Sequence, residues 1–175
     1  MEQGGAGDGL FIISRGTVKV TAGDYVIDIL GPGSMIGEMA VLTDGKRTAT
    51  VTAETPVTAL WMNSSGMQEV MKDSRELESR LWDTAGKRFA ENMLGKSEPY
   101  IKWTNIHLRR WLSQGEVISS GQDEILNLDN RVGVLIYGQA FDKSHLAISA
   151  PVVLEKKEFT LSSGARVFVR SVEKM

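Results

Sequence analysis

The sequence predicts a mainly β fold with helices, arranged as two small units within 175 residues. Up to about residue 62, short β-branched or aromatic stretches alternate with glycine turns, which is typical of a compact antiparallel β unit. From residue 63 the apolar residues follow a helical period, and a second strand-rich region comes after Pro99. Because 42% of the residues are hydrophobic, the chain has enough apolar surface to build a core.

The composition excludes several classes of protein. The 20 Lys+Arg and 22 Asp+Glu give a formal net charge of −2, which does not suit a nucleic-acid binder, so no nucleic-acid partner is expected. There is no cysteine, which rules out disulfides and thiolate metal sites. No apolar run approaches the roughly 18 residues needed to span a bilayer, and the polar first residues are not a signal peptide. We therefore expect this segment to be soluble.

Five strands are expected in the first unit. In residues 17–21, alternation places Val18 and Val20 on one face and polar residues on the other, as a half-buried strand requires. The 18 glycines of the chain indicate many tight turns between such strands. The expected strands are residues 10–14, 17–21, 25–30, 48–53 and 57–62.

A long helix is expected over about residues 74–94, after a shorter one over about 65–71. Asp73 can cap its start, Gly95 follows its last apolar residue, and Pro99 prevents its continuation. The simplest interpretation of its apolar stripe is packing against the β unit. The stripe repeats every four residues and consists of Leu77, Leu81, Ala85, Phe89 and Met93.

The second half, residues 99–175, is expected to be another small β-rich unit. A helical piece over about residues 105–113 leads into it, and no long linker separates the halves. We therefore expect the two units to be packed through the helices. The clearest strands of this half are residues 131–138, 145–154 and 165–172.

No catalytic residue and no metal site are expected. His107 and His145 are the only histidines, and neither has a histidine partner at i+3 or i+4 to make a zinc pair. The glycines between Gly31 and Gly37 do not fit a dinucleotide fingerprint, because the third is one residue late and Pro32 lies in the turn. No serine lies in a nucleophile elbow. The sequence therefore favours a protein that is not an enzyme.

One stretch, residues 36–51, carries residues suited to a sugar phosphate. Gly37 permits close backbone approach, and a helical turn beginning at Glu38 aims free N–H groups at an anion. A guanidinium at Arg47 suits bidentate pairing with phosphate, whereas a carboxylate at Glu38 suits a sugar hydroxyl. The alternative is a plain Glu38–Arg47 ion pair on a loop.

This stretch and the phrases before it resemble the cyclic-nucleotide-binding domain. The ordered match runs through residues 7–13, 16–18, 30–33 and 37–51 and covers about residues 2–94. The resemblance implies a jelly-roll-like β-roll of eight strands, closed by a C-terminal lid helix. It also implies a cyclic nucleotide, cAMP or cGMP, as regulatory ligand, with no other cofactor.

By this resemblance, Arg47 binds the cyclic phosphate and Glu38 takes the ribose 2′-hydroxyl. Backbone N–H groups near the start of the helical turn and after Arg47 complete the cradle. Phe89 and Met93 of the lid helix are the candidates for contact with the base. The candidate ligand-binding residues are Gly37, Glu38, Met39, Ala40, Arg47, Thr48 and Ala49.

Three details of the match modify these expectations. The family's leading helix and first strand should precede Glu2, so the first domain, residues 1–98, is expected to be an incomplete roll. Lys46 stands where many members carry proline, which should alter loop stiffness more than ligand contacts. Thr48 slightly favours cGMP over cAMP as the ligand, because its hydroxyl can form a hydrogen bond with a guanine amino group or with the phosphate.

Shorter phrases in the remainder resemble the cytoplasmic tail of eukaryotic sodium/proton exchangers, of the plant salt-overly-sensitive or the sperm type. They imply a regulatory domain on the cytoplasmic side of a membrane that controls a sodium/proton antiporter. Its partners would be the transmembrane transport domain of the same parent chain and a second copy in a homodimer. The phrases are Leu81-Trp82, Leu108-Arg109 and residues 115–118, 132–138 and 165–169.

Two alternatives to an antiporter domain stay open. One is a ligand-free interaction or dimerisation module. The other is the cyclic-nucleotide sensor of a cation channel or of a kinase regulatory subunit. The second β-rich unit is expected to be regulatory and to lack a binding cassette, since Glu116 is followed by an arginine only at Arg131.

Overall fold

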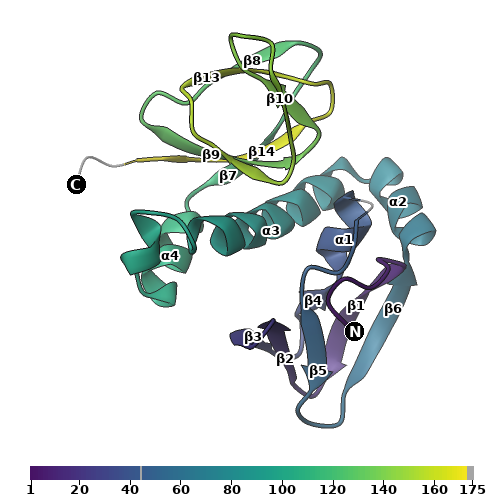
Figure 1. Ribbon diagram of the computed structural model, residues 1–175. Coiled ribbons are helices and arrows are strands. Elements are labelled where there is room, and N and C mark those ends of the chain that lie inside the picture. Colours follow the sequence, from purple (N-terminus) through teal and green to yellow (C-terminus); the bar gives the residue numbers. More distant parts are fainter. Residues whose placement is uncertain (44, 173–175) are drawn as a thin grey trace. The chain divides into compact units, whose positions relative to one another are not determined.

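The computed structural model describes residues 1–43 and 45–172 (Figure 1). The chain divides into two compact units, Met1–Glu78 and Ser79–Met175. This division falls within the long helix α3 (Arg75–Leu94), whereas the sequence predicts a boundary between residues 98 and 99. The physical reason is that α3 packs against strands of the second unit, as the contacts of Gly86 below show.

Two antiparallel sheets form the described part of the first unit. Its strands are β1 (Gly9–Arg15), β2 (Val18–Ala22), β3 (Tyr25–Leu30), β4 (Met35–Ile36), β5 (Thr50–Ala53) and β6 (Thr58–Asn63). The sheet orders are β4-β1-β6 and β3-β2-β5. Ile13, Val18 and Ile36 form a core cluster that contains residues from both sheets. The five expected strands are present with ends shifted by at most two residues, and the short β4 is additional.

Three helices begin within the first unit: α1 (Glu38–Thr43), α2 (Ser64–Asp73) and α3. The Oγ of Ser74 accepts a hydrogen bond from the N–H of Leu77 at 3.2 Å, so Ser74 caps α3. The predicted cap at Asp73 is wrong, because α2 extends through Asp73 and leaves one residue between the helices. At the other end, the N–H of Gly95 bonds to the carbonyl of Glu91 at 3.0 Å, and α3 ends where the sequence predicts.

Two four-stranded sheets form the described part of the second unit (Figure 1). The 3₁₀ helix η1 (Tyr100–Lys102) and α4 (Asn105–Leu112) precede them. The predicted strand 145–154 is divided into two, because Pro151 has no N–H for the sheet ladder. The strands are β7 (Glu116–Ser119), β8 (Glu124–Asn127), β9 (Arg131–Tyr137), β10 (Gln139–Phe141), β11 (Ala147–Ser149), β12 (Val152–Leu154), β13 (Glu158–Leu161) and β14 (Arg166–Ser171).

The two units share one strand order. The orders β4-β1-β6 and β3-β2-β5 of the first unit correspond to β12-β9-β14 and β11-β10-β13 of the second. The second unit adds β7 beside β14 and β8 beside β13. In the first unit the place beside β5 is taken by Met1, whose carbonyl oxygen accepts from the N–H of Val51 at 2.9 Å. Among the described residues, no strand pairs with the outer edge of β6. We call this shared two-sheet arrangement the roll.

Helix α3 lies directly on the sheet that contains β7 and β9. A Cβ atom at Gly86 would be 2.3 Å from Cγ2 of Val117 and 2.8 Å from Cδ1 of Ile136. The ring of Trp82 lies 5.8 Å from that of Tyr137, measured between centroids. Neither α3 nor any other helix of the described residues is long and apolar enough to cross a membrane.

Candidate functional site

Arg47 lines a pocket in the first unit. Its side chain is only 4% exposed. Its Nη1 donates to the carbonyl oxygen of Gly37 at 3.0 Å, and its Nη2 donates to Oδ1 of Asp8 at 2.7 Å. A buried guanidinium held by two acceptors is a fixed cation in the pocket wall. The pocket has a volume of about 620 Å³ and is lined by Met1, Glu2, Gly5, Ala6, Asp8, Phe11, Val18, Ile36, Arg47, Val51, Ala53, Val57 and Ala59.

Asp8 is the site residue to which the sequence analysis assigns no role. Its carboxylate is 72% exposed and makes the ion pair with Arg47. Gly7 lies so close to α1 that a Cβ atom there would be 2.5 Å from Cβ of Ala40, and this approach brings Asp8 beside the Arg47 loop. The carboxylate of Asp8 therefore forms an ion pair with Arg47. The signal in the sequence is an acidic residue held between two glycines.

Gly37 occupies a position that only glycine fits without strain. Its φ angle is +85°, in the left-handed region that L side chains rarely adopt. A Cβ atom at Gly37 would also be 2.3 Å from Nη1 of Arg47. The sequence predicts that Gly37 lets another group come close to the backbone, and in the structure that group is the guanidinium of Arg47. Any side chain at this position would displace that guanidinium.

The other candidate residues flank Arg47 and Gly37. Glu38, Met39 and Ala40 are buried in α1. Thr48 is exposed, and its hydroxyl donates to Sδ of Met39 at 3.5 Å, whereas Ala49 is half-buried. Arg47 is the member of the expected set that is found among the lining residues of the pocket.

The two lid candidates lie on the part of α3 that belongs to the second unit. Phe89 is buried and Met93 is half-buried. Close to them, Nε of Arg109 in α4 donates to Oε1 of Glu91 in α3 at 2.6 Å. This ion pair ties the C-terminal part of α3 to α4.

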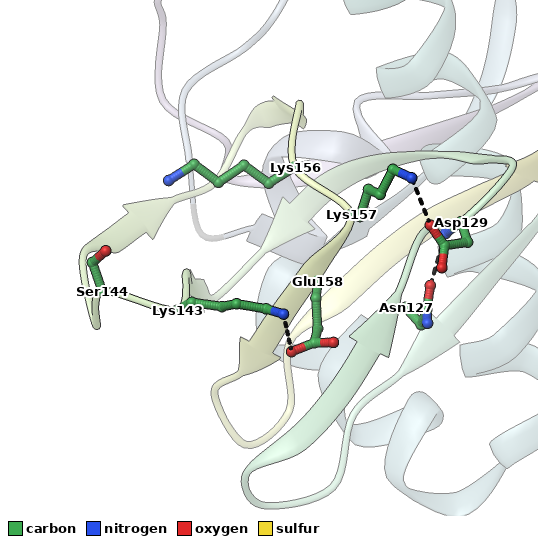
Figure 2. A pocket seen from close by; sticks show the side chains of 7 residues that line it. All are labelled: Asn127, Asp129, Lys143, Ser144, Lys156, Lys157 and Glu158. Carbon is green, nitrogen blue, oxygen red and sulfur yellow. Dashed lines mark hydrogen bonds and ion pairs between the residues drawn. The ribbon is translucent and has the colours of Figure 1, made fainter.

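The second unit connects the corresponding strands by a much shorter link. Residues 37–49 join β4 to β5 in the first unit, whereas residues 155–157 join β12 to β13. Figure 2 shows the pocket of about 350 Å³ beside this link. Within it, Nζ of Lys143 is 3.3 Å from Oε1 of Glu158, and Nζ of Lys157 is 3.3 Å from Oδ1 of Asp129. Because carboxylates face these lysines, the pocket offers little excess positive charge for a phosphate.

A buried carboxylate, Asp142, holds two loops of the second unit together. It accepts hydrogen bonds from Nζ of Lys156 and from the N–H groups of Leu146 and Ser144. The hydrogen bond from Lys156, followed by those from the backbone, lowers the pKa of Asp142 below its ordinary value. Among the described residues, no group of three or more metal-ligating side chains comes together.

Comparisons with known proteins find relatives of the first unit. Residues 1–74 match the family description of the cyclic nucleotide-binding domain. A cyclic nucleotide-gated potassium channel of Rhizobium etli is 35% identical over 86 residues, which cover 49% of this chain and 24% of the channel. A CRP-like cAMP-activated global transcriptional regulator of Mycobacterium tuberculosis is 30% identical over 91 residues, 49% of this chain and 41% of the regulator.

A cGMP-dependent protein kinase of Drosophila melanogaster is 30% identical over 98 residues, which cover 51% of this chain and 13% of the kinase. The match therefore spans less than half the length of each of these relatives. The first unit has the β-rich fold of the cyclic nucleotide-binding domain, and this part of the chain is related to channel, kinase and transcriptional regulators.

Proposed function

We propose that the first unit binds a cyclic nucleotide, cAMP or cGMP, and transmits its binding to a larger protein as a regulatory domain without catalytic activity. One observation carries this proposal: the buried guanidinium of Arg47 lines a largely apolar pocket. The match of residues 1–74 to the cyclic nucleotide-binding domain supports it.

The residues that line the pocket suit the two parts of such a ligand. Val18, Ile36 and Val51 offer an apolar wall to the base and the sugar. Arg47 uses two of its N–H groups on Gly37 and Asp8 and has others left for the cyclic phosphate. Asp8 is exposed, so it can move aside when the phosphate enters.

The remaining candidate residues take the roles that the family resemblance implies. Glu38 would accept the ribose 2′-hydroxyl. Backbone N–H groups near Met39, Ala40 and Thr48 would complete the phosphate cradle, with Gly37 and Ala49 beside them. The relatives include a cAMP-activated regulator and a cGMP-dependent kinase, so they do not decide between the two nucleotides.

Calorimetric titration of the 175-residue chain with cAMP and cGMP tests the proposal. A charge-assisted contact contributes roughly 1.5–3 kcal/mol, so Arg47→Ala should weaken binding at least about tenfold. Arg15→Ala, which removes an exposed arginine of β1, is the matched control and should not change affinity. Absence of saturable binding at millimolar nucleotide, in a chain that melts cooperatively, would leave the ligand-free interaction module as the better hypothesis. Sedimentation would then show whether that module is a homodimer.

The conformational element that responds to the ligand would be the C-terminal part of α3. A ligand shifts a conformational equilibrium only through contacts that it makes better in one state. Phe89 and Met93 would supply these contacts over the base, and the Glu91–Arg109 pair would pass any displacement to α4. Hydrogen exchange should show protection of residues 85–94 on addition of nucleotide, and an unchanged pattern there would refute the lid.

We further propose that the regulated protein is a sodium/proton antiporter and that the chain lies on the cytoplasmic side of its membrane. The exchanger-like phrases, which extend to residue 169, support this assignment. The related potassium channel favours a cation channel as the second candidate. In the parent sequence, about a dozen hydrophobic segments of roughly 20 residues would support an exchanger. About six such segments, with an Arg-rich fourth, would indicate a channel.

A further inference from the structure

A groove beside α4 in the second unit is cationic and aromatic. We call it the α4 groove; its volume is about 420 Å³. Two arginines and one histidine line it, and no carboxylate is among its lining residues. Those residues are Thr104, Ile106, His107, Arg110, Trp111, Gln114 and Arg170.

Arg170 is fixed in the wall of the α4 groove. Its Nε donates to the carbonyl oxygen of Trp111 at 3.2 Å, and its Nη2 donates to Oε1 of Gln114 at 2.5 Å. The guanidinium also lies over the indole of Trp111, 5.5 Å from the ring centroid. Arg110, in the last turn of α4, is exposed. The groove therefore combines a held cation with one that is free to adjust to a ligand.

Aliphatic side chains project into solvent beside these cations. Ile106 is 82% exposed and lies four residues before Arg110, so both occupy the same face of α4. In η1, Ile101 is 55% exposed. Behind them, the rings of Trp103 and Trp111 pack edge to face at 5.6 Å between centroids. Ile106 thus places exposed aliphatic surface among the lining residues of the α4 groove, beside its cations, and Ile101 adds a second exposed isoleucine in η1.

The local charge differs from that of the whole chain. Within residues 96–110, Lys102 pairs with Glu98 and Arg109 pairs with Glu91, so these two cations are offset by carboxylates. The α4 groove has Arg110 and Arg170 but no acidic residue among its lining residues, whereas the chain as a whole has a net charge of −2. Charge complementarity thus calls for an anionic partner. The protruding isoleucines can enter between lipid chains, while the arginines of the groove bind anionic head groups at the same surface.

We infer that the α4 groove and Ile101 dock on an anionic membrane surface. In this arrangement Ile101 and Ile106 enter the boundary between head groups and acyl chains. Arg110 and Arg170 bind the phosphate or carboxylate groups of the lipids. This inference does not depend on nucleotide binding, because all of these residues belong to the second unit.

Vesicle sedimentation with the full 175-residue chain tests the inference. Vesicles of phosphatidylcholine with about 30% phosphatidylserine should bind the chain, and phosphatidylcholine alone should bind it much more weakly. Ile106→Ser and Arg110→Gln should each weaken binding about fivefold, and raised salt should weaken it further. Ile125→Ser, at an isoleucine of β8 that is 67% exposed, and Arg15→Gln are the matched controls and should bind like the wild type.

Several outcomes would overturn the inference. They are absence of binding to the anionic vesicles at low salt, equal binding to both kinds of vesicle, and equal loss of binding in the control variants. Soluble polyglutamate distinguishes an acidic protein partner from a membrane. If polyglutamate binds and Ile106→Ser weakens that binding as much as vesicle binding, the groove recognises acidic proteins instead. Unchanged melting temperatures would show that the surface variants are folded.

Discussion

The carboxylate of Asp8 accepts a hydrogen bond from Nη2 of Arg47 at 2.7 Å, although one side chain is 72% exposed and the other only 4%. This ion pair holds the guanidinium of Arg47 in one orientation. It also neutralises part of the positive charge that would attract a cyclic phosphate.

Because exposed ion pairs contribute at most about 1 kcal/mol, Asp8→Asn should tighten nucleotide binding by no more than about fivefold. The carbonyl oxygen of Gly37 still holds the guanidinium in this variant. Calorimetry of the variant and the wild type measures the change. Weaker binding by Asp8→Asn would show that Asp8 orients Arg47 more than it competes with the phosphate.

Gly37→Ala should lower nucleotide affinity nearly as much as Arg47→Ala does, because the new Cβ atom would displace Nη1 of Arg47. Gly33→Ala is a matched control: Gly33 has a φ of +86°, close to the +85° of Gly37, but nothing lies within 4 Å of the position that its Cβ atom would take. Both variants should lose about 1 kcal/mol or more of stability from backbone strain. If Gly37→Ala and Gly33→Ala bound nucleotide with equal affinity, the close approach of residue 37 to Arg47 would have no role in binding.

Thr48→Ala should weaken cGMP binding about two- to tenfold, the range expected for one hydrogen bond, and leave cAMP binding nearly unchanged. The hydroxyl is available for this role because Thr48 is exposed and its present acceptor is the weakly accepting sulfur of Met39. Thr52→Ala, on β5, is the control. Equal losses for both nucleotides would remove Thr48 as a selectivity residue.

Gly86→Ala should destabilise the packing of α3 on the second unit by about 1–3 kcal/mol, the usual range for overpacking a core. Alanine is the better helix former, but its Cβ atom would lie 2.3 Å from Cγ2 of Val117. The melting temperature of the chain measures the effect. Gly121→Ala, where the nearest atom would be 3.8 Å away, should change it little. A higher melting temperature for Gly86→Ala would mean that α3 does not pack closely on β7.

Acid should destabilise the second unit through Asp142. Its pKa is lowered by Lys156 and by the N–H groups of Leu146 and Ser144, so its charged form stabilises the folded state. This contribution is fully present above the ordinary aspartate pKa of about 4 and is lost as the pH falls through the lower folded value. Asp142→Asn should therefore lose less stability than the wild type between about pH 5 and pH 2, as measured by calorimetry.

Most of the secondary structure could be predicted where local signals are strong. The bounds of β3 follow from its apolar run between glycine turns, and Gly95 marks the end of α3. The strands β7, β8, β10 and β13 could not be predicted, because each has only three or four residues and owes its conformation to pairing with strands distant in the sequence. The apolar stripe of α3 likewise does not indicate which sheet the helix packs on, and the structure divides the units within α3 rather than after residue 98.

The candidate site shows the same limit. The cassette motif indicates Gly37 and Arg47 as neighbours in one loop, and the structure places the carbonyl of one on the guanidinium of the other. Asp8 is 39 residues away from Arg47 in the sequence, and no spacing rule connects them. Only the pairing of β1 with its neighbours and the close approach of Gly7 to α1 bring the two together.

The short link between β12 and β13 shows which parts of a roll are dispensable. Leu154 and Phe159 flank it on either side, and both are buried in one cluster with residues from both sheets of the second unit. A roll can therefore close its interior with three residues at the place where the first unit carries the whole Arg47 cassette. If the proposed function holds, the Arg47 cassette is an insertion in a frame that the second unit closes without one, so mutation of the cassette should change sensitivity to a ligand while the strands keep their pairing.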